Sequence, residues 1–273
     1  MTLTEMNYYS QEMNKKYLSV SQFKSFVGTP FEEACERKAL AELNGEYVRE
    51  KSDALLIGSY VDTSLTGTEK DMSIFKANNP EIFSSRGPTK GRLKSTYKKA
   101  NFMIDRVRKD KLMMKTLSGE HQVIMTGTIF GADWKIKIDS LLPNAIVDLK
   151  TVESINKSYY SVMHGRRVSF VEYFDYILQG AIYQEVVRQN TGKKLPFFLS
   201  AVSKEPVPDI AVIQIDNATL EEKLESIETY VEPILALKKG DVEPTKCGHC
   251  DFCKEHKVLK SPINWLEIGG ELR

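Results

Sequence analysis

Two acidic residues and one lysine are spaced so that together they could hold a divalent metal ion. In the segment IVDLK, Asp148 and Lys150 are two positions apart, so a β-strand presents both on one face while Leu149 points into the core. Asp139 ends the preceding segment, KIKID, and a tight hairpin at Pro143-Asn144 would bring it beside Asp148. Two carboxylates at one end of a sheet repel each other unless a cation lies between them, and hard oxygen ligands favour Mg²⁺ or Mn²⁺.

This arrangement predicts hydrolysis of phosphodiester bonds. A bound ion would lower the pKa of a water ligand and polarise the scissile phosphate, and Lys150 would place a positive charge beside the attacking water. A D-x-K triplet alone is common, however, and often lies at an exposed strand end. The interpretation therefore depends on the motifs around the triplet.

Those motifs resemble a known superfamily. The run G-x-x-x-G-x-x-x-K-x-K-I-D, followed by I-V-D-L-K-T, resembles the core of RecB-like and RecE-like PD-(D/E)xK nucleases, which include phage and prophage exonucleases. The Q-x-x-x-Y helix of that superfamily is matched by Gln179 and Tyr183, which share one helical face. Segments near both ends, YLSVSQFK, GSYVD, NTGKKLPFFLSAVSKEP and CGHCDFC, extend the resemblance over nearly the whole chain.

The resemblance implies a role for each site residue. Metal ligands would be Asp62, Asp139, Asp148 and the backbone carbonyl of Leu149. Lys150 would position water and stabilise the transition state, while Gln179 and Tyr183 would orient the site and the DNA strand. Many relatives have histidine where this chain has Asp62, so the metal preference could differ. Asp62 falls on the same predicted helix stripe as Leu55, and exposure of its side chain is the alternative. Glu120 is a weaker acidic candidate.

Three of the four cysteines occur as CGHCDFC near the end of the chain. This spacing of Cys247, Cys250 and Cys253 is typical of metal ligands rather than of a disulfide framework. Cys35, His249 and His256 are the candidates for a fourth ligand. In some RecB-like nucleases an upstream cysteine joins three late ones to hold an iron-sulfur cluster, and Cys35 matches that order. The alternatives are Zn²⁺ or free thiols, and in each case the role is structural.

The expected function is that of a metal-dependent DNA exonuclease that resects duplex ends in phage-type recombination. The implied partners are linear duplex DNA, a single-strand annealing protein and further copies of the chain. One alternative is a catalytically silent nuclease fold that binds DNA or assembles with other proteins. Another is a nuclease that acts on single strands, flaps or RNA.

Length and composition indicate the number of domains and the class of protein. The chain has 273 residues, of which 41% are hydrophobic and 27% charged, and these values indicate one elaborated domain. We expect a helical part over residues 1–118, a nuclease core over 119–216, and a final helix with the cysteine cluster over 217–273. No apolar run approaches membrane-spanning length, which predicts a cytoplasmic protein without membrane contact.

The predicted fold class is mixed α/β, with a restriction-endonuclease-like core in which helices flank a central mixed sheet. We expect helices over 30–44, 53–65, part of 91–119, 171–192 and 218–240, the last kinked at Pro233. Phe31, Cys35, Ala39 and Leu43 would share the inner face of the first helix. Three strands are expected between 121 and 151, and two more over 197–204 and 210–216.

Positive charge is concentrated in one segment. Ten Lys or Arg residues lie between Lys90 and Lys115, against Asp105 and Asp110. The segment is either a solvated helix surface or a phosphate-binding surface. A second basic group, His164 with Arg166 and Arg167, could also contact a phosphate backbone.

Overall fold

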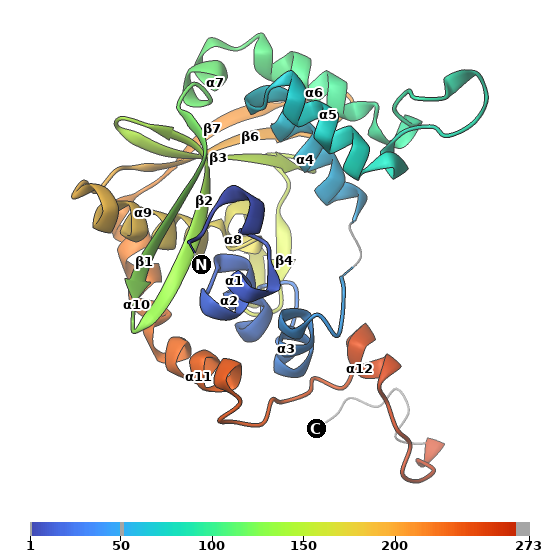
Figure 1. The fold of residues 1–273 in the computed structure, drawn as a ribbon, viewed down its shortest axis with the longest axis vertical. Helices are drawn as coiled ribbons and strands as arrows, with labels where there is room; N and C mark the ends of the chain where they lie inside the picture. The colour runs from blue at the N-terminus through green and yellow to red at the C-terminus, as the bar shows by residue number, and fades with distance from the viewer. Residues whose placement is uncertain (1, 50–51, 266–273) are drawn as a thin grey trace.

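A five-stranded mixed sheet forms the centre of the computed structural model, which describes residues 2–49 and 52–265 (Figure 1). Its strand order is β1-β2-β3-β6-β7, and only β3 and β6 pair in parallel. The strands are β1 (Glu120–Ile129), β2 (Ala132–Leu142), β3 (Ala145–Val152), β6 (Phe197–Ser203) and β7 (Ile210–Ile215). The predicted three-stranded meander, the hairpin at Pro143-Asn144 and the two later strands are confirmed.

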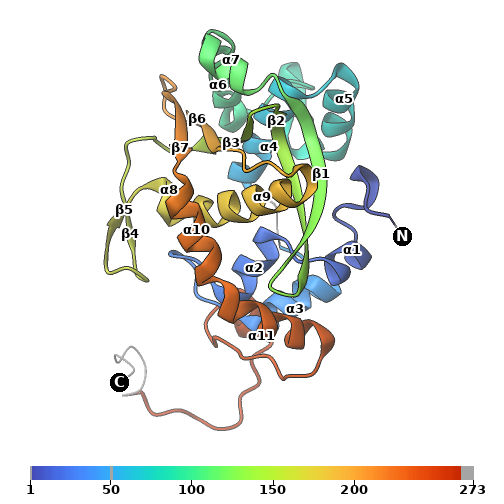
Figure 2. The same ribbon diagram turned by 90° about the vertical axis from the view of Figure 1, so that its left-hand side faces the viewer.

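Helices cover both faces of the sheet. On one face, α9 (Tyr176–Thr191) forms the crossover between β3 and β6, and α10 (Asn217–Ser226) packs against it (Figure 2). Their shared core includes Trp134, Ile146, Ile182 and Phe197, and α2 (Val20–Val27) and α11 (Glu228–Lys239) complete it. The opposite core joins Leu149 to α4 (Asp53–Thr66), α6 (Lys99–Arg108) and α7 (Lys111–Thr116). The predicted mixed α/β class, with helices flanking a central mixed sheet, is thus confirmed.

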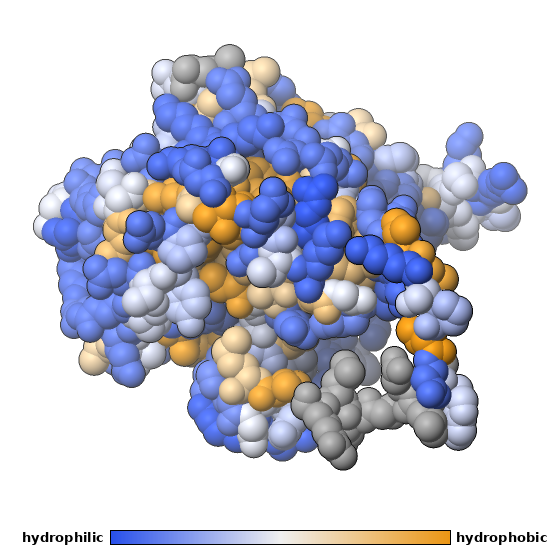
Figure 3. All heavy atoms as spheres, turned by 90° about the horizontal axis from the view of Figure 1, so that it is seen from below, coloured by the Kyte–Doolittle hydropathy of each residue, from blue (hydrophilic) through white to orange (hydrophobic). Residues whose placement is uncertain are grey.

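The remaining elements extend this core. They are α1 (Gln11–Lys16), α3 (Glu36–Asn44), α5 (Glu69–Asn78), α8 (Phe170–Tyr173), α12 (Asp251–Glu255) and a separate hairpin of β4 (Tyr159–Ser161) with β5 (Arg166–Val168). Short 3₁₀ helices span Glu5–Asn7, Pro80–Ile82, Gly87–Thr89 and Ser95–Tyr97. No helix among the described residues is long and apolar enough to cross a membrane. Seen from below, hydrophobic residues form small separate areas on a mostly hydrophilic surface (Figure 3).

The start of the first predicted helix was wrong. The helix α3 begins at Glu36, not near Pro30, because Thr29 caps a local turn by accepting hydrogen bonds from the N–H groups of Phe31 and Glu32. Phe31 lies outside the helix and is 46% exposed. Cys35, Ala39 and Leu43 are buried as expected, and the predicted end at Asn44-Gly45 is confirmed.

Two long predicted helices are each divided in the structure. The 171–192 helix is interrupted at Asp175, which adopts a left-handed conformation with φ of 49°. The 218–240 helix is interrupted at Ile227, which is buried in the core, and Pro233 lies inside α11 rather than at the break. The basic segment becomes helical only from Lys99, after two 3₁₀ turns. The 53–65 helix agrees with α4.

A glycine in α9 allows close packing beneath the candidate site residue Gln179. A Cβ atom added at Gly180 would lie 2.7 Å from a ring carbon of Phe197 and 2.8 Å from a methyl carbon of Leu220. We therefore expect Gly180→Ala to lower the free energy of unfolding by about 1–3 kcal/mol, because the core would be overpacked. Urea denaturation measures this change. The exposed control Glu222→Ala should stay within about 0.5 kcal/mol of the unchanged protein, and an equal effect of both substitutions would contradict the packing argument.

Candidate active site and cysteine cluster

The site lies where β2 and β3 separate. Their pairing ends at Ser140 and Val147, and beyond this point the Asp139 carboxylate accepts a hydrogen bond from the Leu149 N–H at 2.9 Å. In an extended strand the N–H and C=O of one residue point to the same side. The carbonyl of Leu149 therefore faces the same gap as the Asp139 carboxylate, as a metal ligand would need to.

Asp148 and Lys150 project from β3 on the side of α9. The Lys150 Nζ lies 2.6 Å from Asp148 Oδ2, and Gln179 Nε2 donates to Asp148 Oδ1 at 2.5 Å. The Lys150 ammonium also lies 4.6 Å from the centre of the Tyr176 ring, at the start of α9. The break at Asp175 lets α9 begin beside β3, so Tyr176 and Gln179 both reach the site.

Asp62 enters the site from α4. Its side chain accepts hydrogen bonds from Thr66 Oγ1 at 3.2 Å and from Gln122 Nε2 at 3.1 Å. Gln122 has a φ of 55°, an uncommon conformation for a residue with a side chain, at the point opposite Asp139 where regular β1–β2 pairing is interrupted. Leu55, expected to share the buried stripe with Asp62, is 58% exposed, because Leu56, Ile57 and Val61 form the core face of α4.

These side chains line one cleft with a volume of about 1080 Å³. Its walls come from the amino-terminal segment, α2, α3, α4, β2, β3 and α9. The cleft contains every sequence-predicted active-site residue, namely Asp62, Asp139, Asp148, Leu149, Lys150, Gln179 and Tyr183. The Tyr183 hydroxyl donates to the Lys137 carbonyl at 3.0 Å and so braces β2 next to Asp139.

Burial and mutual repulsion destabilise the ionised carboxylates. Burial raises the pKa of Asp139 well above its ordinary value, and the neighbouring Asp148 and Asp62 raise it further. The pKa of Asp62 is also raised, mainly by burial, although the Thr66 hydroxyl opposes the shift. Burial alone would lower the pKa of Lys150, but the carboxylate of Asp148 outweighs it and keeps the amine protonated. A cation between the carboxylates would offset the cost of burying their charges and reduce the repulsion between them.

The donor set fits a hard divalent ion. Asp148 Oδ2 is buried, and apart from its charge contact with Lys150 it accepts no hydrogen bond of regular geometry from the described residues. Carboxylate and carbonyl oxygens are the ligands that Mg²⁺ and Mn²⁺ take. The three carboxylates are spread more widely than the cysteine thiols. In the described part of the chain, the four cysteines are the only group of three or more His, Cys, Asp or Glu residues whose ligand atoms all lie within 4.8 Å of one another.

Several residues of the cleft were not anticipated from sequence. Lys24, from α2, donates to the Phe174 carbonyl at 2.8 Å and lies near the Tyr176 ring, and burial lowers its pKa to about 8. Lys137 lies 5.8 Å from the centre of the Tyr9 ring. The only sequence signal for Lys137 was its period-two relation to Asp139 in β2. No local pattern places Lys24 or Tyr9 in the site, because they lie more than a hundred positions away from Asp139 and Asp148.

The amino-terminal wall depends on a buried lysine. Lys135 is 1% exposed, and its amine donates to the Tyr8 carbonyl and to Asn14 Oδ1. Burial lowers the pKa of Lys135 to about 8, whereas the unfolded chain keeps a value near 10.4. Between these values the unfolded state binds more protons, so we expect this residue to add about 1 kcal/mol of stability from pH 8 to pH 9.

Urea denaturation at the two pH values tests this expectation. Lys135→Met should lose the part of the stability gain between pH 8 and pH 9 that Lys135 contributes, even if the substitution also changes the stability at each pH. The exposed control Lys257→Met should show the same gain as the unchanged protein. An unchanged increase in Lys135→Met would show that another group titrates.

The residues of the basic segment lie outside the cleft. None of the ten Lys or Arg residues between 90 and 115 lines it, and most are exposed on α6, α7 and the preceding turns. Glu120 and His121 are also exposed at the start of β1 and lie outside the cleft lining. The His121 ring is in hydrogen-bonding contact with the Asp139 carbonyl at 3.2 Å.

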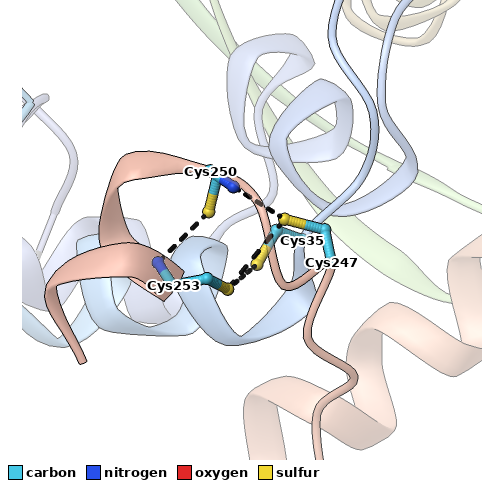
Figure 4. A group of neighbouring side chains, drawn as sticks. All are labelled: Cys35, Cys247, Cys250 and Cys253. Carbon is cyan, nitrogen blue, oxygen red and sulfur yellow. Dashed lines mark hydrogen bonds between the residues drawn. The ribbon is translucent and has the colours of Figure 1, made fainter. Parts of the chain in front are cut away.

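The four cysteines converge at a second site (Figure 4). Cys35 precedes α3, and the other three come from the segment around α12. The Sγ of Cys253 lies 3.6 Å from that of Cys35 and 3.9 Å from that of Cys247. Burial opposes ionisation, but hydrogen bonds from the backbone of His249 and Cys250 lower the pKa of Cys247 to about 6.

The fourth member of the cysteine site is thus Cys35 rather than a histidine. His249 faces Glu33 at 3.2 Å, and His256 stacks on the Phe252 ring. Four thiols in one small volume are suited to a soft metal ion or cluster, and they tie the end of the described chain to α3.

Comparisons with known proteins identify the family of the chain. Residues 19–256 match the model of a family described as a PDDEXK-like domain of unknown function. The chain belongs to this family. It is also similar to the crystal structure of a "putative exonuclease" from Eubacterium rectale, with 46% identity, full coverage of both chains and a TM-score of 0.92. No curated protein matches the chain. Membership in this PDDEXK-like family supports a nuclease function and places the chain in the PD-(D/E)xK superfamily.

Proposed function

We propose that this protein is a divalent-metal-dependent deoxyribonuclease that removes nucleotides from the ends of linear duplex DNA. The observation that carries the proposal is the meeting of Asp139, Asp148 and Lys150 at the point where β2 and β3 separate, inside a large cleft. The description of the similar Eubacterium rectale protein as an exonuclease supports attack at DNA ends.

Each residue of the site has a part in this reaction. Asp62, Asp139, Asp148 and the Leu149 carbonyl would hold Mg²⁺ or Mn²⁺, which when bound lowers the pKa of water and polarises the phosphate. The protonated Lys150 stabilises the negative charge that develops on the phosphate. Gln179 fixes one oxygen of Asp148, and the Tyr176 ring confines the Lys150 amine. Tyr183 braces β2 through the Lys137 carbonyl.

The biological setting belongs to the same proposal. The resemblance to RecE-like nucleases supports duplex-end resection in phage-type recombination, together with a single-strand annealing protein. It also supports a cytoplasmic location and assembly of several copies. Each of these finer points rests on the resemblance.

A substrate panel tests the proposed activity. Linear duplex, closed circular duplex, single-stranded DNA and RNA, each labelled at the 5′ or 3′ end where an end exists, are incubated with Mg²⁺, Mn²⁺ or EDTA. We expect metal-dependent loss of the linear duplex alone. Cleavage of closed circles would identify an endonuclease, and preference for RNA or single strands would reject the duplex assignment. No cleavage of any substrate would favour a silent DNA-binding fold.

For the cysteine site, a single tetrahedral ion such as Zn²⁺ is the better fit than an iron-sulfur cluster. A tetrahedral ion with bonds of about 2.3 Å holds its four sulfur ligands roughly 3.8 Å apart. Two of the Sγ separations, 3.6 and 3.9 Å, agree with that value, and all four Sγ atoms lie within 4.8 Å of one another. A cluster places several iron atoms between the thiolates and would hold their sulfurs farther apart. Elemental analysis and visible absorption of protein purified without oxygen decide the point, because bound iron with brown colour would overturn the zinc assignment.

A further inference from the structure

The hairpin of β4 and β5 is a projecting element next to the site. It follows β3, the strand of Asp148 and Lys150, and leads directly into α8 and α9. Figure 2 shows it standing away from the body of the molecule. Its two ends are therefore joined to the strand and the helix that carry the candidate catalytic residues.

Aromatic rings connect the hairpin to the cleft. Tyr159, in β4, stacks on Tyr173 with ring centres 4.6 Å apart and contacts Phe174 at 5.7 Å. Phe174 contacts Tyr176 at 5.8 Å, and the Tyr176 ring lies 4.6 Å from the Lys150 amine. The base of the hairpin thus packs, through Phe174, against the Tyr176 ring of the cleft wall.

The hairpin is internally braced. Arg167 donates from Nε to Ser158 Oγ at 2.8 Å and from Nη2 to the Ser158 carbonyl at 2.7 Å. Arg166 forms an ion pair with Glu172 at 2.6 Å. The His164 N–H donates to the buried Ser161 hydroxyl, which fixes the turn at the tip. These contacts hold the strands and the turn of the hairpin together.

The tip exposes apolar side chains. Val162 is 82% exposed, Met163 is 61% exposed, and Tyr160 beside them is 59% exposed. Residues 157–171 include three Lys or Arg residues and no Asp or Glu. Adjacent exposed apolar side chains on a projecting hairpin indicate a binding surface. Lys157 and Arg166 are paired with Glu153 and Glu172, so Arg167 carries the remaining positive charge, which attracts the phosphates of a nucleic acid while the apolar side chains contact bases.

We propose that this hairpin contacts the terminal base pair of a duplex and separates it, so that one strand enters the cleft. Val162 and Met163 would press against the base pair as apolar wedges, and Tyr160 offers a ring on which a freed base can stack. Contact with a protein partner or a second copy is the competing use of the tip. The ring contacts that join the hairpin to Tyr176 in the cleft wall favour DNA, the proposed substrate of that cleft. This inference rests on the proposed activity at duplex ends.

The test compares a blunt duplex with the same duplex carrying an unpaired end of several nucleotides. The double substitution V162S/M163S should slow digestion of the blunt duplex about tenfold and leave the frayed duplex unaffected. The factor corresponds to the roughly 1.4 kcal/mol of one base-pair step. V258S/L259S is the matched control, because these adjacent apolar residues are 81% and 76% exposed at another surface. The proposal would be overturned if V162S/M163S digested both substrates as fast as the unchanged protein. It would also be overturned if the variant were slowed by the same factor on both substrates.

A binding assay separates this inference from the proposed activity. A duplex with 2-aminopurine in its terminal pair is mixed with the full chain in Ca²⁺, and its fluorescence should rise as the base unstacks. The rise should be lost in V162S/M163S and kept in V258S/L259S. Failure of the nuclease proposal would leave every substrate undigested while this signal persists. Failure of the hairpin proposal would leave digestion intact and the signal equal in all variants.

Discussion

Asp148→Asn should reduce the rate of DNA digestion roughly 10³-fold while the protein remains folded. The substitution keeps the shape of the side chain, and the Gln179 amide can still donate to its oxygen. It removes the negative charge that would bind the metal ion and that lies 2.6 Å from the Lys150 amine. Initial rates on end-labelled linear duplex in Mn²⁺ measure the loss, and circular dichroism checks the fold.

Glu120→Gln is the matched control for this experiment. Glu120 is an exposed carboxylate at the start of β1, and it does not line the cleft. Its amide variant should keep the rate of the unchanged protein. If Asp148→Asn were as active as that control, the digestion would come from another site or from a contaminating enzyme, and the proposed active site would be rejected.

Cys253→Ser should lower the midpoint of thermal unfolding by about 10 °C. The substitution removes a buried thiol that lies close to those of Cys35 and Cys247, so a metal ion at the site would lose a ligand. The size follows from a loss of about 3–5 kcal/mol, as for removal of a covalent cross-link, at roughly 2–4 °C per kcal/mol in a chain of this size. Scanning calorimetry measures the midpoint.

A chelator provides the control for the cysteine prediction. It should lower the midpoint of the unchanged protein by a similar amount and leave Cys253→Ser unaffected, because the variant has no bound ion to lose. A chelator that shifts both proteins equally would act elsewhere. If neither the chelator nor the substitution changed the midpoint, the cysteines would be free thiols in a packed loop.

The parts of the fold that were predictable from sequence depend on local patterns. Enrichment in β-branched and aromatic residues, interrupted by turn residues, identified β2 and β3, and the turn at Pro143-Asn144 joined them, so Asp139 could be placed beside Asp148. The four-residue spacing of Gln179 and Tyr183 placed both on one face of α9. These patterns involve only residues that are close in sequence, so they can be recognised without knowing the tertiary contacts.

Contacts between distant residues explain what the sequence did not predict. The 171–192 helix breaks at Asp175 because Lys24 binds the Phe174 carbonyl and Lys223 pairs with Asp175, and both lysines come from other helices. Thr29 has the pattern of a helix cap, but here it closes a turn before α3. The basic segment could have faced the cleft, and only the packing of α6 against α4 places it outside. Helix propensity does not contain this information.

The position of Cys35 has a topological consequence. It lies near the beginning of the chain and meets residues close to the end, and Cys247 follows Cys35 by 212 positions. An ion shared by these residues closes almost the entire nuclease core into one ring. Ring closure of this length restricts the unfolded chain by about 5 kcal/mol in entropy models. A peptide-bond cut in an exposed loop inside the ring would therefore leave two fragments that stay attached to each other.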